Sequence, residues 1–160
     1  LSREQLFALA LRQTLELEPV EVEWVELGAA ADSGSSRHAA VGSVRIAVLS
    51  SDSLLAASHA LALGDHAELV GPQGTLFAVP NRHHVLAIPV DGLDVPQAVD
   101  RMLPVVASMF AEGPGAISPN LYWRQANGAI EVQTVTLADG SKGGMNVQFE
   151  PGEGFRALLG

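Results

Sequence analysis

The fold is decided by residues 75–90, which read Thr75-Leu76-Phe77-Ala78-Val79, then Pro80-Asn81-Arg82-His83, then His84-Val85-Leu86-Ala87-Ile88-Pro89-Val90. Two apolar runs of strand length flank four residues that are typical of a tight connection. The pattern predicts an antiparallel hairpin, which is the clearest local signal in the chain.

The residues before this hairpin predict a helix and two strands. Ser2 and Gln5 have the spacing of a capping box at the start of a helix over 3–17, and Pro19 ends that helix. Residues 20–27 alternate apolar with acidic side chains, the period of a half-buried strand. After the low-complexity stretch 28–42, which predicts a flexible loop, the segment 43–49 reads as a second strand.

Helical signals follow in two further places. A short helix is expected over 54–62, with caps offered by Ser51-Asp52-Ser53. A long helix is expected from Val95 to Ala111 with Asp94 as its cap, and Pro104 should kink or split it because proline lacks the donor for the preceding turn.

The last forty residues predict a β-meander. Strands over 121–124 and 129–137 flank an Asn-Gly turn at Ala126-Asn127-Gly128, and a short strand follows over 145–149. The short tail after 151–154 is a candidate for a helix. This element order predicts an α+β fold: a mainly antiparallel sheet with about three helices packed on one face. The 160 residues fit a single domain.

Composition excludes several classes of function. The chain has 18 acidic and 9 basic residues, a formal net charge of -9, so nucleic acid is an unfavourable partner. It has no cysteine, which excludes disulfides, thiolate metal ligands and thiol nucleophiles. No apolar run reaches the roughly 18 residues of a membrane span, and no signal peptide is visible, so the expected location is cytoplasmic. The bias toward arginine, alanine and glycine suggests a bacterial genome.

Metal binding is not favoured by the spacing of the acidic residues and histidines. His83 and His84 would point to opposite faces of a strand, and His59 and His66 lie seven residues apart with a glycine between them. Glutamates on an exposed strand face more often provide solubility and edge protection than a cation site. We therefore expect no metal and no cofactor.

The candidate binding residues lie in two loops. Asn81, Arg82 and His83 form the connection of the first hairpin, and Ser118 belongs to a turn-rich loop that precedes the aromatic residue Tyr122. Loops carry functional polar side chains more often than cores do. For each of these residues the alternative is structural: hydrogen bonds within its own turn, or for Tyr122 a place in the core or over a groove.

Three segments resemble a known family. They are 51–59, 74–83 and 116–122, with a small-residue helix, an apolar strand ending in Val79-Pro80-Asn81-Arg82, and Ile117-Ser118-Pro119 before an aromatic strand. In these motifs the chain resembles the uncharacterised bacterial family that includes the Bacillus protein YtpQ. His83 stands where that family has an acidic residue, and the resemblance implies no reaction, cofactor or partner.

Two functions follow as hypotheses. The first is a non-enzymatic protein-binding or assembly module, with a homodimer that uses the sheet or its edge as one form of it. The second is a small hydrolase-like enzyme whose polar site gathers Asn81, Arg82, His83 and Ser118, although the chain lacks both a Gly-x-Ser-x-Gly motif and a phosphate-binding loop. The absence of these motifs favours the first hypothesis.

Overall fold

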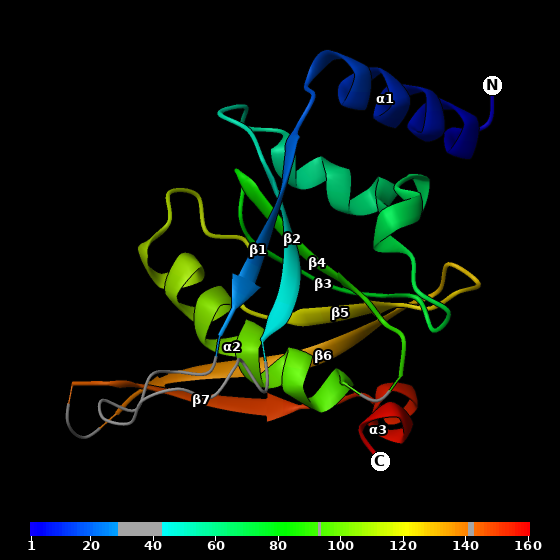
Figure 1. Ribbon diagram of the computed structural model, residues 1–160. Helices are drawn as coiled ribbons and strands as arrows, with labels where there is room; N and C mark the ends of the chain where they lie inside the picture. The colour runs from blue at the N-terminus through cyan, green and yellow to red at the C-terminus, as the bar shows by residue number, and fades with distance from the viewer. Residues whose placement is uncertain (29–42, 93, 141–142) are drawn as a thin grey trace.

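The computed structural model describes residues 1–28, 43–92, 94–140 and 143–160 (Figure 1). The loop predicted over 28–42 lies, apart from Gly28, outside the described residues. Seven strands form one sheet in the order β1-β2-β4-β3-β5-β6-β7, and all their pairings are antiparallel. The predicted α+β class with an antiparallel sheet is confirmed.

The strands have the following bounds: β1 Glu21–Leu27, β2 Val44–Ser50, β3 Thr75–Asn81, β4 His84–Pro89, β5 Leu121–Arg124, β6 Ile130–Asp139 and β7 Met145–Glu150. The helices are α1 Arg3–Leu17, α2 Val95–Glu112 and α3 Glu153–Leu159, together with the 3-10 helices η1 Ala56–Asp65 and η2 Ala67–Leu69. Each predicted strand and helix is present within a few residues of its expected bounds.

The hairpin of β3 and β4 forms the centre of the sheet. Its connection is shorter than predicted, because Asn81 pairs with His84 and only Arg82 and His83 lie outside the ladder. The register shifts between Ala78 and Asn81, next to Pro80. A bulge is the expected position for a proline inside a strand, since it has no N–H to donate to the ladder.

Helices cover both faces of the sheet, whereas the sequence predicts them on one. On the first face Leu86 and Ile88 of β4 pack against α2, and the side chain of Phe155 from α3 joins them. On the second face Val85 and Ala87 pack against Leu63 of η1. Successive residues of β4 thus serve two cores, which is why its sequence is a continuous apolar run.

Two helices differ in detail from their prediction. The short helix begins later and is a 3-10 helix that includes Gly64 rather than ending before it. The long helix α2 continues through Pro104 without splitting. Asp94 stands at its N-cap position, but the side chain makes no capping hydrogen bond, so the expected capping role is wrong and the carboxylate is left exposed.

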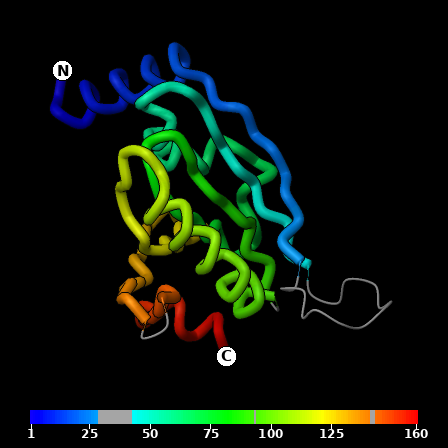
Figure 2. The backbone as a smooth tube through the Cα atoms, turned by 90° about the vertical axis from the view of Figure 1, so that its left-hand side faces the viewer, coloured from blue at the N-terminus to red at the C-terminus, as the bar shows by residue number. Residues whose placement is uncertain are grey.

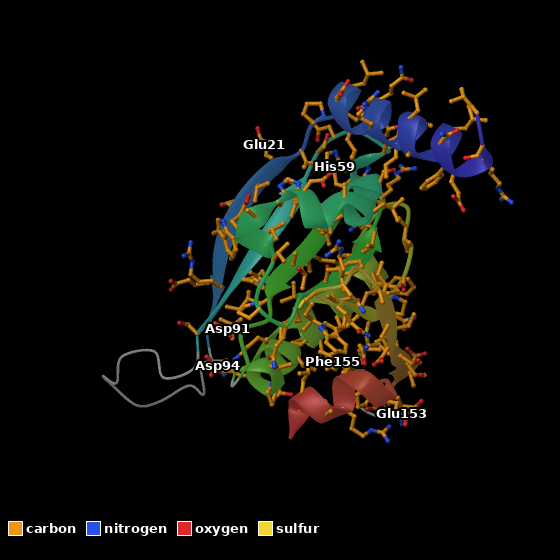
Figure 3. The ribbon with its side chains drawn as sticks, turned by 90° about the vertical axis from the view of Figure 1, so that its right-hand side faces the viewer. Glu21, His59, Asp91, Asp94, Glu153 and Phe155 are labelled. Atoms are coloured by element: carbon orange, nitrogen blue, oxygen red, sulfur yellow. The ribbon has the colours of Figure 1, made fainter. Side chains whose placement is uncertain are left out.

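Helix α1 lies across one end of the molecule, over η1, with its N-terminus pointing away from the sheet (Figure 2). The predicted capping box of Ser2 and Gln5 is confirmed. His59 of η1 is 6% exposed and its Nε2 lies 2.7 Å from the carbonyl oxygen of Glu18, so η1 binds the C-terminal end of α1 (Figure 3). None of the residues of α1, all of which are described, is buried.

Helix α3 is attached to β6 by two polar side chains. The Glu131 carboxylate accepts hydrogen bonds from the backbone N–H groups of Gly154 at 3.0 Å and Phe155 at 2.8 Å. Gln133, which is fully buried, accepts one from Gly152 at 2.6 Å. These bonds satisfy N–H groups that the first turn of a helix leaves unpaired. The bonds that the Glu131 carboxylate accepts lower its pKa, with the bond from Phe155 as the largest cause.

Candidate functional site

The predicted residues of the hairpin connection are held by their own turn. Asn81 is 2% exposed, and its Oδ1 accepts hydrogen bonds from the backbone N–H of His83 at 3.0 Å and from Nδ1 of His84 at 2.8 Å. Its Nδ2 donates to the carbonyl oxygen of Met109 in α2 at 3.4 Å. Each polar atom of the Asn81 side chain therefore has a structural partner.

Arg82 and His83 contact each other. Arg82 Nε donates to His83 Nε2 at 3.2 Å, and His83 Nδ1 lies 3.1 Å from the carbonyl oxygen of Ser51. Since Nε2 accepts, Nδ1 carries the proton and donates to Ser51, which assigns the neutral tautomer in this arrangement. The aliphatic part of Arg82 covers Gly115, so the loop after α2 lies beside this turn.

Ser118 and Tyr122 form a second, separate pair. The Tyr122 hydroxyl donates to Ser118 Oγ at 2.8 Å, and Ser118 Oγ also accepts the backbone N–H of Asn120 at 3.1 Å. The Tyr122 ring stacks on Phe77 with 5.3 Å between centroids. Arg82 N donates to the carbonyl oxygen of Gly115, and Ser118 N donates to that of Val79, so the hairpin connection contacts the loop after α2 three residues before Ser118.

The side-chain hydrogen bonds therefore divide the five candidates into two groups. Among the hydrogen bonds of the described residues, none joins Ser118 to Arg82 or His83. A nucleophile and its base need to be within hydrogen-bond reach of each other. The contacts of these residues are those of two well-formed turns.

An open depression of about 750 Å³ lies beside the two histidines. Its lining includes Glu21, Asp52, His83 and His84. Burial, followed by the neighbouring His83, lowers the pKa of His84, so the neutral imidazole is favoured there. Within the part of the chain that the structure describes, no group of three or more His, Asp or Glu side chains is arranged to hold a metal ion.

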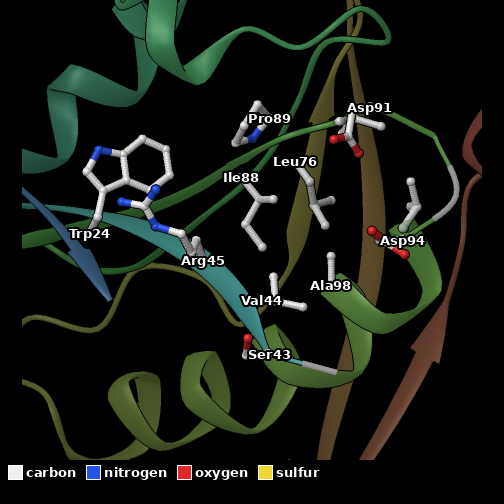
Figure 4. Close-up of a pocket in the computed structure, with 12 residues that line it drawn as sticks. Trp24, Ser43, Val44, Arg45, Leu76, Ile88, Pro89, Asp91, Asp94 and Ala98 are labelled. Carbon is white, nitrogen blue, oxygen red and sulfur yellow. The ribbon is translucent and has the colours of Figure 1, made fainter. Parts of the chain in front are cut away.

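A second cavity, of about 310 Å³, was missed by the sequence predictions. It lies between the ends of β2 and β4 and the first turn of α2 (Figure 4). The Arg45 guanidinium lies over the Trp24 ring, 5.0 Å from its centroid, at one side, and Asp91 and Asp94 lie at the other. Between these two ends the cavity is lined by apolar side chains of the core, those of Val44, Leu76, Ile88, Val95 and Ala98.

One signal for this cavity was present in the sequence. Pro89 interrupts a strand that is otherwise apolar and flanked by other strands, and a proline there removes a ladder hydrogen bond. The identity of the strand facing Pro89 could not be read from the sequence, because β2 is separated from β4 by more than thirty residues.

Comparisons with known proteins give no family for this chain. No protein-family model, no curated protein and no solved structure matches it. The resemblance to the family that includes YtpQ stays a prediction. In the described part of the chain, no helix has both the length and the apolar character that crossing a membrane requires.

Proposed function

We propose that this chain is a protein-binding or assembly module that pairs with a second copy of itself through α1. The observation that carries the proposal is the exposure of this helix. Leu6, Leu9 and Leu17 are 51%, 38% and 78% exposed. Together with Ala10 they form one stripe, with the helical spacing of a packing face.

This stripe is the side of α1 that η1 does not cover. The half-buried residues of the helix are Leu11, Thr14 and Leu15, which lie on another side. A 15-residue helix is marginally stable in water by itself and obtains most of its stability from packing of an apolar face. Contact with a second protein surface would give the uncovered stripe of α1 that packing.

A second copy is the occupant that the pattern fits. In an antiparallel pair of α1 helices, Leu6 of one copy would stand opposite Leu17 of the other, and the small Ala10 opposite Gln13. The same pairing brings Arg3, at the start of the helix, toward Glu16 and Glu18 at the end of the other helix. The contact is self-complementary, as a two-fold interface requires.

Charge supports self-association at this face rather than elsewhere. The residues of α1 include two arginines and two glutamates, whereas the whole chain carries twice as many acidic as basic residues. Repulsion between two acidic chains is therefore weakest where these helices meet. The edge strand β1, in contrast, exposes Glu21, Glu23 and Glu26, which disfavour edge-to-edge pairing.

The test is sedimentation velocity over a range of micromolar concentrations. We expect a reversible dimer that Leu6→Glu or Leu17→Glu converts to a monomer. The control is Ile130→Glu, an equally exposed side chain (49%) on β6, which should leave the dimer intact. A monomer at every concentration, or a dimer that is insensitive to both α1 substitutions, would refute self-association through this helix.

The contacts give no support to the hydrolase-like alternative. Ser118 accepts hydrogen bonds from Tyr122 and Asn120, and no described contact supplies it with a base. A cytoplasmic location belongs to the proposal as the setting predicted from the sequence.

A further inference from the structure

The cavity at the β2 and β4 ends results from a break in the sheet. The pairing of these strands stops at Ala47 and Ala87. If the register continued by two residues, Arg45 would stand opposite Pro89. Val90 N donates to Gly74 on the β3 side. Because N–H directions alternate along a strand, the nitrogen of Pro89 faces β2. It has no hydrogen to donate, so one of the two hydrogen bonds of an Arg45–Pro89 pair cannot form. The described pairing ends before this position, and the strand ends separate around the cavity.

The separation leaves main-chain groups facing the cavity. By the same alternation, the N–H and C=O of Arg45 point toward β4, beyond the last paired residue. The C=O of Arg45 therefore lacks the N–H donor that a residue other than proline would supply at position 89. A peptide N–H group supplies the missing donor, as it does when an extended segment is added to a strand.

The side chains define what such a segment must carry. The buried floor is apolar: Leu76 is 0% exposed, Val95 is 3% exposed and Ala98 is 6% exposed. Asp91 and Asp94 are exposed at one end, and neither has an ion-pair partner among the described residues. At the other end of the cavity, the Arg45 guanidinium lies over the Trp24 ring in a cation–π contact. The site thus combines an apolar surface with an excess of one negative charge.

We propose that this cavity binds an extended peptide segment that carries an apolar side chain followed by a lysine or arginine. The main chain of the segment pairs with Arg45, the apolar side chain enters the space between β4 and α2, and the basic side chain reaches Asp91 and Asp94. The volume of about 310 Å³ is at the lower end for ligand pockets and suits two or three residues. The net charge of -9 further favours a basic ligand.

The test is an NMR titration of the backbone amides of the whole chain with the capped tripeptide Ac-Leu-Ala-Lys-NH2. We expect saturable shifts centred on Val44, Arg45 and Val95. The charge-reversed peptide Ac-Leu-Ala-Glu-NH2 should bind several-fold to about tenfold more weakly, as the loss of one or two exposed ion pairs predicts.

Matched variants separate the site from the general acidity of the chain. Replacing Asp91 and Asp94 together by Asn should weaken binding of the lysine peptide by about three- to tenfold. Replacing Asp52 and Asp65 together by Asn removes the same charge from exposed positions outside the cavity and should have no such effect.

Three results would overturn the proposal. The first is the absence of saturable shifts up to peptide concentrations on the order of 10 mM, far above the range of useful binding. The second is a set of shifts centred on β1 or β7 instead of the cavity. The third is equal binding of hexylammonium, which has the apolar chain and the cation but no peptide group, because the main chain of the ligand would then play no part.

Discussion

The attachment of α3 to β6 predicts a measurable effect of one side chain. Glu131→Gln keeps the size of the side chain and removes its charge. The carboxylate receives two backbone N–H groups of the first turn of α3, at 3.0 and 2.8 Å, whereas the N-cap residue Gly152 has no side chain to do so. The amide of glutamine keeps one acceptor oxygen and places an N–H group where the other was.

The expected loss is about 1 kcal/mol in the free energy of unfolding at pH 7. Loss of a capping side chain costs roughly 0.5–2 kcal/mol, and one of the two acceptors is retained, so the middle of that range applies. For a chain of this length, this corresponds to a fall of about 2–4 °C in the melting temperature. Phe155 is fully buried, and its ring centroid lies 5.7 Å from that of Trp123. This packing keeps α3 in place in the wild type and in Glu131→Gln alike.

The pH dependence distinguishes a charged cap from a packing effect. The hydrogen bonds lower the pKa of Glu131 from its ordinary value of 4.5. A lowered carboxylate pKa contributes stability that is present above pH 4.5 and is lost as the pH falls through the folded-state value. The difference between wild type and Glu131→Gln should therefore be largest near neutral pH and shrink in acid.

The assay is urea denaturation followed by circular dichroism at several pH values. The control is Glu150→Gln, which removes one charge from an exposed residue of β7. Equal stability of wild type and Glu131→Gln at pH 7, or a difference that is unchanged below the folded-state pKa, would refute the capping role.

Three other predictions concern stability. His59→Ala should cost about 2 kcal/mol, because it opens a buried space and leaves the Glu18 carbonyl without its 2.7 Å partner; urea denaturation checks this, with the partly exposed His66→Ala nearly neutral. Burial, followed by the neighbouring His83, lowers the pKa of His84, so the contribution of the neutral imidazole to stability is complete above pH 6.5 and is lost as the pH falls toward the folded-state pKa. NMR titration of His84 and the pH profile of the unfolding free energy should show this loss. A His84→Gln variant with the same pH profile as the wild type would contradict it. Gly74→Ala should lower the melting temperature by several degrees, since φ is +93° and a Cβ would meet the Arg124 carbonyl, whereas Gly144→Ala, with open space around it, should not.

Local signals predicted most of the fold. The capping box of Ser2 and Gln5 gave the start of α1, and the Asn-Gly turn, where Gly128 has φ +88°, gave the hairpin of β5 and β6. These features depend on neighbouring residues in the chain. The division of helices between two faces depends on which strands meet, and the continuous apolar run of β4 is compatible with either arrangement.

The candidate site was less predictable for the same reason. Asn81, Arg82 and His83 do contact one another, as adjacent residues of a turn can. Ser118 lies in a different loop, the one after α2, and its side chain bonds to Tyr122 and Asn120. The cavity beside Arg45 depends on the missing N–H of Pro89 and on its position opposite β2, which only the tertiary structure provides. Asp94 shows the same limit: its position before α2 is that of a cap, but its side chain makes no capping bond.

The pairing of β6 divides the sheet into two parts that can separate. Its first residues pair with β5 from Ile130 to Gln133, and its later residues pair with β7 from Thr134 to Asp139. β7 and α3 therefore contact the rest of the sheet through one strand and a few side chains. In native-state hydrogen exchange, residues 134–160 should open together as one cooperative unit, at a lower free energy than the β3–β4 centre. The C-terminal part would then become accessible to proteases before the β3–β4 centre does.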